Sequence, residues 1–348
     1  MVDRRSSVPI SIIHAFGIRE GVPIQPFGSG HINRTFKIDD GELSFVLQRV
    51  NHHVFRMPEI IATNIRLASD HLKKNHPDYL FLSPLPSQTG LDMVYDEEGY
   101  PWRLLPYFKN SITINEVGIP LEAYEAARGF AQLAKNLSGC DVSKFKPTID
   151  RFHDLNWRFE QFQEALAGAK PDRLKKATEA IQACQDFSYL VDEYNNLITN
   201  GFLKLRVMHN DTKINNILLD SLTRKVICVI DLDTLMPGYF IFDLGDMVRT
   251  FVSPVSEEEQ DLTKIIFRKD IYDALLQGYL SEMKSELSEK EIQAIPFAGC
   301  MMTYIMALRF LADYLKGDVY YTTTYEGQNL NRALNQLKLV EILRKNPR

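Results

Sequence analysis

The stretch that decides the fold is RVMHNDTKINNILLDSLTRKVICVIDLDT, which runs from Arg206 to Thr234. Its first apolar residues predict a strand that enters a polar loop at His209, and ILLD and VICVI predict two short strands joined by the turn DSLTRK. Antiparallel pairing of these two strands would bring Asn216 near Asp231. One amide oxygen and one carboxylate oxygen that converge in this way form a hard oxygen site suited to Mg²⁺.

The polar loop also holds the other groups that phosphoryl transfer needs. Asp211 lies five residues before Asn216, so it can face a substrate hydroxyl while Asn216 faces the metal. Lys213 lies between them and supplies a cation for the transferred phosphoryl group. We therefore predict that Asp211 and Lys213 are catalytic, that Asp211 also contacts the substrate, and that Asn216 and Asp231 hold Mg²⁺. The alternative is an ordinary loop of capping Asn and Asp residues.

The spacing H-x-D-x-K-x-x-N, followed by a strand pair and an Asp, resembles the catalytic core of the protein-kinase-like fold. Asn210 stands where protein kinases have Arg, and this makes the loop similar to that of the aminoglycoside phosphotransferase and choline kinase-like superfamily. The resemblance implies that His209 supports the loop and that Asp243, in FIFDLGDMVR, braces it. An acid in the first turn of a helix is an equally simple explanation for Asp243.

Further segments resemble N-acetylhexosamine 1-kinases over nearly the whole chain: GHIN, IDLDT with MPG, FD-GD, and RFLADYL-GD-Y. The resemblance implies transfer of the γ-phosphate of ATP to the anomeric hydroxyl of N-acetylglucosamine or N-acetylgalactosamine. It also implies substrate-binding roles for His31, Asn33, Arg309 and Tyr320. For Arg309 the alternative is an ion pair with Asp313, four residues away on the same helix face.

The segment FGSGHINRTFKI places Gly28, Ser29 and Gly30 between two predicted strands. Glycine lets the backbone approach a phosphate closely. The segment lacks a Walker A motif and no helix follows it directly, so neither a P-loop nor a Rossmann site fits. We predict that this loop covers the phosphates of ATP.

The strand that follows, SFVLQRV, departs from the kinase pattern. Kinases carry a Lys there that binds phosphate and a Glu of the next helix, whereas this chain has Gln48 at the matching position and Arg49 beside it. Because side chains alternate, only one of the two faces the cleft. We predict that Gln48 and Arg49 bind the nucleotide. Three states of Arg49 stay open: an ion pair with Glu59, no such pair, or a solvated surface position. Pro106 and Tyr107 begin the predicted hinge and are also predicted to bind the nucleotide.

The remaining pattern predicts an α+β, protein-kinase-like two-lobe fold with ATP in the cleft between the lobes. The small N-terminal lobe, 1–107, carries an antiparallel sheet and a helix over 57–75. The larger lobe, 108–348, is mainly helical, notably over 157–200 and 256–344, and holds the catalytic loop, the metal site and the substrate pocket.

Composition narrows the function class. The 348 residues suit two lobes, and the formal net charge of −5 argues against a nucleic-acid partner. The four cysteines form no CxxC pair, which disfavours a zinc site or a disulfide framework. The short, broken apolar start and the lack of a run of about 18 apolar residues predict neither a signal peptide nor a membrane span. We expect a cytoplasmic enzyme that uses ATP, Mg²⁺ and a small-molecule sugar, with its oligomeric state open.

Two alternatives stay open. The first is a sister kinase that acts on an amino alcohol, an aminoglycoside or another sugar; a cationic acceptor would call for an acid-lined pocket, and the helical segments show no marked acidic cluster. The second is a pseudokinase that binds a nucleotide without turnover. The missing strand Lys favours it, and the complete set of Asp211, Lys213, Asn216 and Asp231 argues against it.

Overall fold

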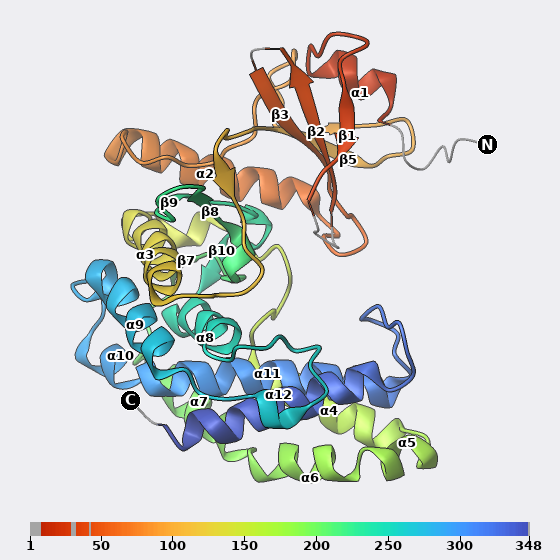
Figure 1. Cartoon of the computed structure of the whole chain (residues 1–348), viewed down its shortest axis with the longest axis vertical. Coiled ribbons are helices and arrows are strands. Elements are labelled where there is room, and N and C mark those ends of the chain that lie inside the picture. Colours follow the sequence, from red (N-terminus) through yellow and green to blue (C-terminus); the bar gives the residue numbers. More distant parts are fainter. Residues whose placement is uncertain (1–7, 29–32, 42, 347–348) are drawn as a thin grey trace.

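The structure is a computed structural model that describes residues 8–28, 33–41 and 43–346. A small antiparallel sheet stands above a larger, mainly helical lobe (Figure 1). The predicted α+β, two-lobe class is therefore confirmed. The predicted boundary at residue 107 stays a prediction.

The small lobe is built on one sheet whose described strands follow the order β1-β2-β3-β5-β4, every neighbouring pair being antiparallel. Its elements are α1 (Ile10–Ala15), β1 (Ile24–Pro26), β2 (Arg34–Asp40), β3 (Leu43–Arg49), β4 (Val94–Tyr95) and β5 (Pro101–Pro106). The predicted succession of strand, glycine loop, strand, turn and strand is confirmed, and the glycine loop lies between β1 and β2.

The two faces of this sheet differ in chemistry. Because side chains alternate along a strand, Phe36 and Leu47 share one face, where they form a small apolar core with α1. The opposite face carries Thr35, Gln48 and Arg103, which are direct partners across β2, β3 and β5. This second, polar face supplies contacts to the catalytic lobe.

Helix α2 (Pro58–Asn75) runs below the sheet, beside β8, β9 and α3 (Figure 1). Pro58 begins the helix, a position where its missing N–H costs nothing. Apolar residues at helical spacing, such as Ile61, Ile65 and Leu72, join the large core of the helical lobe and not the small core under the sheet. The helix therefore couples the two lobes through packing.

The helical lobe is organised around α11. Its helices are α3 (Pro120–Asn136), α4 (Leu155–Gly168), α5 (Pro171–Lys176), α6 (Thr178–Asp186), α7 (Tyr189–Thr199), α8 (Phe240–Phe251), α9 (Lys269–Met283), α10 (Glu289–Gln293), α11 (Ile295–Lys316) and α12 (Gln328–Arg344). Helix α11 is long and apolar enough to cross a bilayer, but 83% of its most apolar window is buried inside the protein, so we assign it to the core. A Cβ at Gly245 of α8 would lie 2.4 Å from the Ala298 carbonyl oxygen, so glycine is what lets α8 pack this closely on α11.

Short strands carry the two functional loops. The hairpin of β8 (Ile217–Asp220) and β9 (Val226–Val229) is extended by β6 (Ser111–Ile112), and β7 (Arg206–Met208) pairs with β10 (Met236–Gly238). The sequence indicates β7, β8 and β9. It does not indicate β10, because Pro237 and Gly238 are disfavoured within strands. The pairing of β7 with β10 brings the start of the catalytic loop next to the end of the metal-side turn.

Candidate active site

The catalytic loop begins at Asn210, which is left-handed with φ 64°. Asn tolerates this conformation better than most residues. Its buried side-chain nitrogen lies within hydrogen-bond distance of three carbonyl oxygens, those of Met208 (2.9 Å), Thr234 (3.1 Å) and Met236 (3.2 Å). Asn210 thus fastens the catalytic loop to β10, which gives a structural reason for Asn at the position that protein kinases fill with Arg.

Asp243, in the first turn of α8, lies directly behind this loop. Its carboxylate accepts the backbone N–H groups of His209 (3.1 Å) and Asn210 (2.7 Å), and its carbonyl oxygen accepts the Thr212 hydroxyl (2.7 Å). Burial raises the pKa of Asp243 to about 7, against the effect of the two N–H donors. These contacts support the bracing role that the resemblance implies.

His209 supports the loop from within. Its Nε2 donates to the Ile230 carbonyl oxygen (2.9 Å), so Nδ1 accepts the backbone N–H of Asp211 (3.2 Å). Burial lowers the pKa of His209 and keeps the ring neutral, as this pair of hydrogen bonds requires. The ring therefore links the catalytic loop to the end of β9.

Asp211 and Lys213 form the charged centre of the loop, with Lys213 Nζ 3.3 Å from Asp211 Oδ1. The Asn216 amide nitrogen donates to the other Asp211 carboxylate oxygen (3.2 Å) and to its carbonyl oxygen (2.9 Å). Burial opposes ionisation of Asp211, but the charge of Lys213 outweighs it and holds the pKa of Asp211 below the ordinary value. Asp211 raises the pKa of Lys213 in turn. The site therefore holds an ionised carboxylate beside a charged ammonium group.

The metal-side residues meet at the open end of the β8–β9 hairpin. Ile217 pairs with Val229, and Ile230 N–H donates to the Asn216 carbonyl oxygen (2.9 Å), so Asn216 lies beside the start of the turn at Asp231. Asp231 is left-handed with φ 57° and reaches solvent. The protein around its carboxylate, and then the charges of Asp233 and Asp211, raise its pKa to about 7.

These residues fit a magnesium ion. The amide nitrogen of Asn216 is used by Asp211, which leaves its oxygen for a metal, and a divalent cation would offset the like charges around Asp231. In the part of the chain that the structure describes, no group of three or more His, Cys, Asp or Glu could hold an ion. A site with two protein oxygens suits Mg²⁺, which keeps waters and substrate phosphates as its other ligands.

Four buried or half-buried residues, which we call the Arg103 cluster, join the sheet to the metal-side turn: Asn33, Gln48, Arg103 and Asp233. Arg103 donates from Nε (2.9 Å) and Nη2 (2.8 Å) to the Gln48 side-chain oxygen, and its Nη1 forms an ion pair with Asp233. Asn33 donates to the other oxygen of Asp233 (2.7 Å) and accepts the backbone N–H of Asn51 (3.0 Å). Both polar ends of Asn33 are therefore used within the protein, and its predicted contact with substrate stays a prediction.

The side chain of Arg49 points away from the Arg103 cluster. Its guanidinium lies 4.2 Å from the centre of the Tyr100 ring, on the face of the sheet opposite Gln48. Glu59 accepts a hydrogen bond from the Tyr95 hydroxyl. Of the two predicted nucleotide residues on β3, Gln48 is thus the one on the face toward the catalytic lobe.

The predicted nucleotide side is described in part. Gly28 is left-handed with φ 82°, a conformation natural to glycine; Ser29, Gly30 and His31 lie outside the described residues. Tyr107 follows Pro106, its ring is in edge contact with Phe27 at 5.8 Å, and a surface cavity of about 660 Å³ opens beside it. The start of the glycine loop and the start of the hinge are therefore neighbours.

The predicted substrate residues Arg309 and Tyr320 lie together with three others, which we call the acceptor-side cluster: Phe152, Arg158, Arg309, Tyr320 and Tyr321. The Arg309 guanidinium lies 5.4 to 5.9 Å from the three aromatic ring centres. Arg158 donates to the Phe152 carbonyl oxygen (2.8 Å) and to Gln161. Neither arginine forms an ion pair with a carboxylate of the described residues.

The expected alternative for Arg309, an ion pair with Asp313, is not formed. Asp313 instead accepts the backbone N–H groups of Val319 (3.0 Å), Tyr320 (2.8 Å) and Tyr321 (2.9 Å) and so shapes the loop that carries both tyrosines. Burial and then the charge of Arg309 lower the pKa of Arg158 to about 10. Two arginines thus share one cluster, and neither forms an ion pair with an acid among the described residues.

His153 connects the acceptor-side cluster to the catalytic loop. Its Nε2 donates to the Asn210 carbonyl oxygen (2.7 Å), and its ring is in contact with Phe152 at 4.1 Å. His153 Nδ1, the Tyr321 hydroxyl and one oxygen of Asp246 are buried without a hydrogen-bond partner among the described residues. Orphaned buried polar atoms are uncommon in folded proteins.

The family comparison agrees with this geometry. The model of the phosphotransferase enzyme family, APH, matches residues 23–282, which include the glycine loop, the catalytic loop and the metal-side turn. The chain belongs to this phosphotransferase family.

Solved structures with the same fold include several kinases. A microcompartment-associated aminopropanol kinase is 16% identical with a TM-score of 0.65, and 97% of each chain is covered. An aminoglycoside phosphotransferase from Alicyclobacillus acidocaldarius is 12% identical with a TM-score of 0.67 and 99% of each chain covered. An amicoumacin kinase in complex with AMP-PNP and Ca²⁺ is 14% identical with a TM-score of 0.62, covering 97% of this chain and 92% of that one. At these identities, the likeness to solved structures supports the fold of this phosphotransferase but does not identify its substrate.

Sequence reasoning missed Arg103, Asp233, Arg158 and His153 in this phosphotransferase. Asp233 stands in the quoted IDLDT segment, so its place two residues after the predicted metal ligand Asp231 was a usable signal. Arg158 and His153 lie on and before α4, far along the chain from the catalytic loop, and no local pattern marks them.

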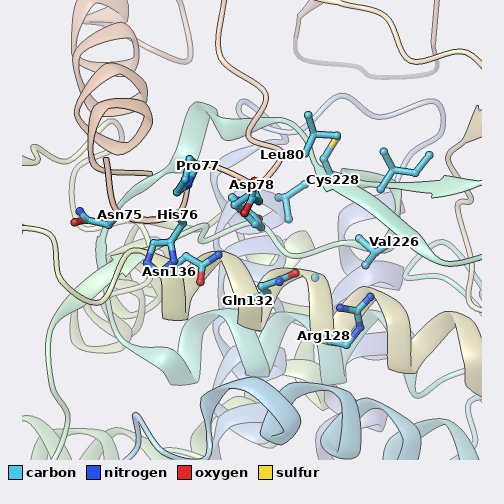
Figure 2. A pocket seen from close by; sticks show the side chains of 14 residues that line it. Asn75, His76, Pro77, Asp78, Leu80, Arg128, Gln132, Asn136, Val226 and Cys228 are labelled. Carbon is cyan, nitrogen blue, oxygen red and sulfur yellow. The ribbon is translucent and has the colours of Figure 1, made fainter. Parts of the chain in front are cut away.

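A separate cavity of about 520 Å³ lies between the C-terminal end of α2, helix α3 and strand β9 (Figure 2). Polar side chains such as Asp78, Arg128 and Gln132 line it. None of the predicted site residues does, so the catalytic assignment of this phosphotransferase does not depend on this cavity.

Proposed function

We propose that this phosphotransferase transfers the γ-phosphate of ATP, in the presence of Mg²⁺, to the anomeric C1 hydroxyl of an N-acetylhexosamine. The observation that carries the proposal is the pair Arg158 and Arg309, which lie beside the catalytic loop without a carboxylate partner among the described residues. Guanidinium groups in this state suit an acceptor rich in hydroxyl and carbonyl oxygens. The likeness of GHIN and RFLADYL-GD-Y to N-acetylhexosamine 1-kinases supports the same choice.

Each residue of the catalytic loop has a defined task in this proposal. Asp211, held ionised by Lys213, accepts a hydrogen bond from the acceptor hydroxyl and takes its proton. Lys213 offsets charge on the transferred phosphoryl group. Asn216 and Asp231 would hold Mg²⁺, which neutralises charge on the phosphates. Catalysis is then mainly positioning and electrostatic stabilisation.

The low pKa of Asp211 suits the acceptor we propose. A carboxylate with a lowered pKa is a weak base, so it needs a hydroxyl that gives up its proton easily. An anomeric hydroxyl is more acidic than an ordinary alcohol. In a loose transition state the attacking hydroxyl also gives up little of its proton before the phosphoryl group moves.

On the nucleotide side, we propose that the loop Gly28–Gly30 covers the phosphates and that Pro106 and Tyr107 contact the base. The neighbouring position of Phe27 and Tyr107 supports a nucleotide pocket at the hinge. Gln48 would act through Arg103, as argued below, and Arg49 would contribute only if it leaves Tyr100.

A kinase for an amino alcohol or an aminoglycoside is the second candidate, and the structural likeness to an aminopropanol kinase is the observation that favours it. An ammonium group would have to enter a cluster that already holds two uncompensated arginines, which is electrostatically costly. We therefore rank this candidate lower. A pseudokinase is disfavoured by the ordered set of Asp211, Lys213, Asn216 and Asp231.

The test is a phosphate-transfer screen of purified protein with ATP and Mg²⁺ against N-acetylhexosamines, other sugars, aminoglycosides and amino alcohols, with Asp211→Asn as the background control. Free N-acetylhexosamines should be the best acceptors, and their methyl glycosides, in which C1 is blocked, should be inert. A methyl glycoside phosphorylated as fast as the free sugar would overturn the C1 assignment. Turnover confined to amino alcohols would overturn the sugar assignment.

A further inference from the structure

The Arg103 cluster occupies the place where kinases of this general fold use a strand lysine. Gln48 stands at the position of that lysine, and its side-chain oxygen accepts two hydrogen bonds from Arg103 on the neighbouring strand β5. The cation is therefore present in this protein, but it comes from the adjacent strand and points toward Asp233.

We propose that Arg103 is a positioning residue that holds the metal-side turn through Asp233 and so replaces the missing strand lysine in coupling the small lobe to the Mg²⁺ site. The inference deepens the proposed function, because it rests on Asp231 and Asn216 holding the metal.

The burial of the pair argues for positioning and against direct phosphate binding. Arg103 and Asp233 each expose only 2% of their surface. Nε, Nη1 and Nη2 of Arg103 all have protein partners, so the guanidinium has no free edge for a phosphate. A buried charge is tolerated when it is paired and hydrogen-bonded, and removing one partner is strongly destabilising.

The turn that carries Asp233 is short and held at both ends. It is the 3₁₀ segment Leu232–Thr234, which directly follows the left-handed Asp231. Arg103 and Asn33 hold Asp233, while the Thr234 carbonyl oxygen accepts a hydrogen bond from Asn210 of the catalytic loop. The position of Asp231 therefore depends on a contact from the small lobe and on one from the catalytic loop.

Asn33 adds the glycine loop to the same connection. It lies at the end of that loop, donates to Asp233 (2.7 Å) and accepts the backbone N–H of Asn51 after β3 (3.0 Å). Groups that orient a metal ligand in this way change metal affinity by about 10–100-fold when they are removed.

The experiment compares Arg103→Met with Arg66→Met. Arg66 is a matched control, because it also forms a two-pronged contact with an aspartate in the small lobe (Asp92, 2.7 and 2.9 Å) but is exposed and has no contact with Asp233. The readout is the Mg²⁺ dependence of ATP binding by titration calorimetry, which needs no acceptor. In Arg103→Met we expect the Mg²⁺ midpoint to rise by about tenfold or more. Arg66→Met should match wild type.

Two further variants keep the inference falsifiable. Arg103→Lys keeps the positive charge but loses the forked geometry of the guanidinium. We expect this variant to fold even if Arg103→Met does not, and to show a smaller rise in the Mg²⁺ midpoint. The double variant Arg103→Gln with Asp233→Asn removes both charges; it should recover thermal stability but keep the raised Mg²⁺ midpoint. A purely structural role would move the melting temperature and leave the midpoint of the folded protein unchanged.

The outcomes separate this inference from the proposed function. If wild-type ATP binding depends on Mg²⁺ and every folded Arg103 variant keeps the wild-type midpoint, the inference is wrong and the proposed function stands. If wild-type ATP binding does not depend on Mg²⁺, the proposed metal site fails and the inference fails with it.

Discussion

The Arg103 cluster and the acceptor-side cluster place arginines in two opposite electrostatic states. Arg103 is paired with Asp233, and its donor groups are used by the protein. Arg158 and Arg309 have only carbonyl, amide, sulfur and aromatic neighbours among the described residues. The comparison supports our proposal that Arg103 organises the protein, whereas Arg158 and Arg309 bind the acceptor.

The difference has a physical basis. Arginine stays charged in proteins, so a buried arginine must find acceptors. Burial, and then the nearby charge of Arg309, lowers the pKa of Arg158 to about 10. A neutral acceptor with several oxygens would offset this effect, and an ammonium group would increase it.

The largest effect is expected between the two clusters, at Asp211. Asp211→Asn keeps the shape but removes the charge and the proton acceptor, so kcat should fall by about 10²–10⁴-fold while ATP affinity changes little. Steady-state kinetics measures the change in kcat, and titration calorimetry measures the ATP affinity. Turnover within about threefold of wild type would remove Asp211 from its assigned role.

Variants of the two proposed metal-binding residues test the metal-side turn, which Arg103 holds through Asp233. Asp231→Ala and Asn216→Ala each remove one proposed oxygen ligand, so both should lose most activity and shift the Mg²⁺ titration to higher concentration. The measurement is initial rate against Mg²⁺ at fixed ATP. Unchanged titrations in both variants would contradict the pairing of these residues at the hairpin end.

A smaller and different effect is expected on the acceptor side. Arg309→Met and Arg158→Met should raise the acceptor KM by about tenfold and change kcat less, because uniform binding lost by a variant appears in KM. Arg332→Met is the matched control: Arg332 also lies over an aromatic ring, Phe310 at 5.6 Å, but has Glu258 as a partner. A kcat loss without a KM change would show that the two arginines act on the reaction and not on acceptor binding.

The smallest effect concerns His153, which joins the acceptor-side cluster to the catalytic loop. Burial lowers its pKa to about 4, so the folded protein keeps it neutral while the unfolded chain protonates near pH 6.5. Its contribution to stability is complete above about pH 6.5 and is lost as pH falls toward 4, amounting to a few kcal/mol at most. The free energy of unfolding, measured by denaturant titration, should therefore fall less in His153→Gln than in wild type as the pH is lowered across this range. Parallel pH profiles would contradict a neutral buried His153.

Local patterns account for much of this outcome. The runs FKI and SFVLQRV on either side of a turn predicted β2 and β3, and the apolar runs ILLD and VICVI joined by a polar turn predicted the hairpin of β8 and β9. What the sequence could not show depends on long-range pairing. Asn33 meets Asp233 across 200 residues, and Arg103 meets Gln48 only because of the register of β3 with β5. Likewise, no local signal assigns α2 to the core of the helical lobe.

The most direct test of the central claim uses two acceptors that differ in the N-acetyl group and, with it, in charge. N-acetylglucosamine is neutral, and glucosamine carries an ammonium group below the pKa of its amine. We predict that kcat/KM at such a pH favours the N-acetyl sugar by at least about 100-fold, and that Arg309→Met narrows the ratio. Equal values, or a preference for the amine, would contradict the claim that uncompensated arginines select the acceptor of this phosphotransferase.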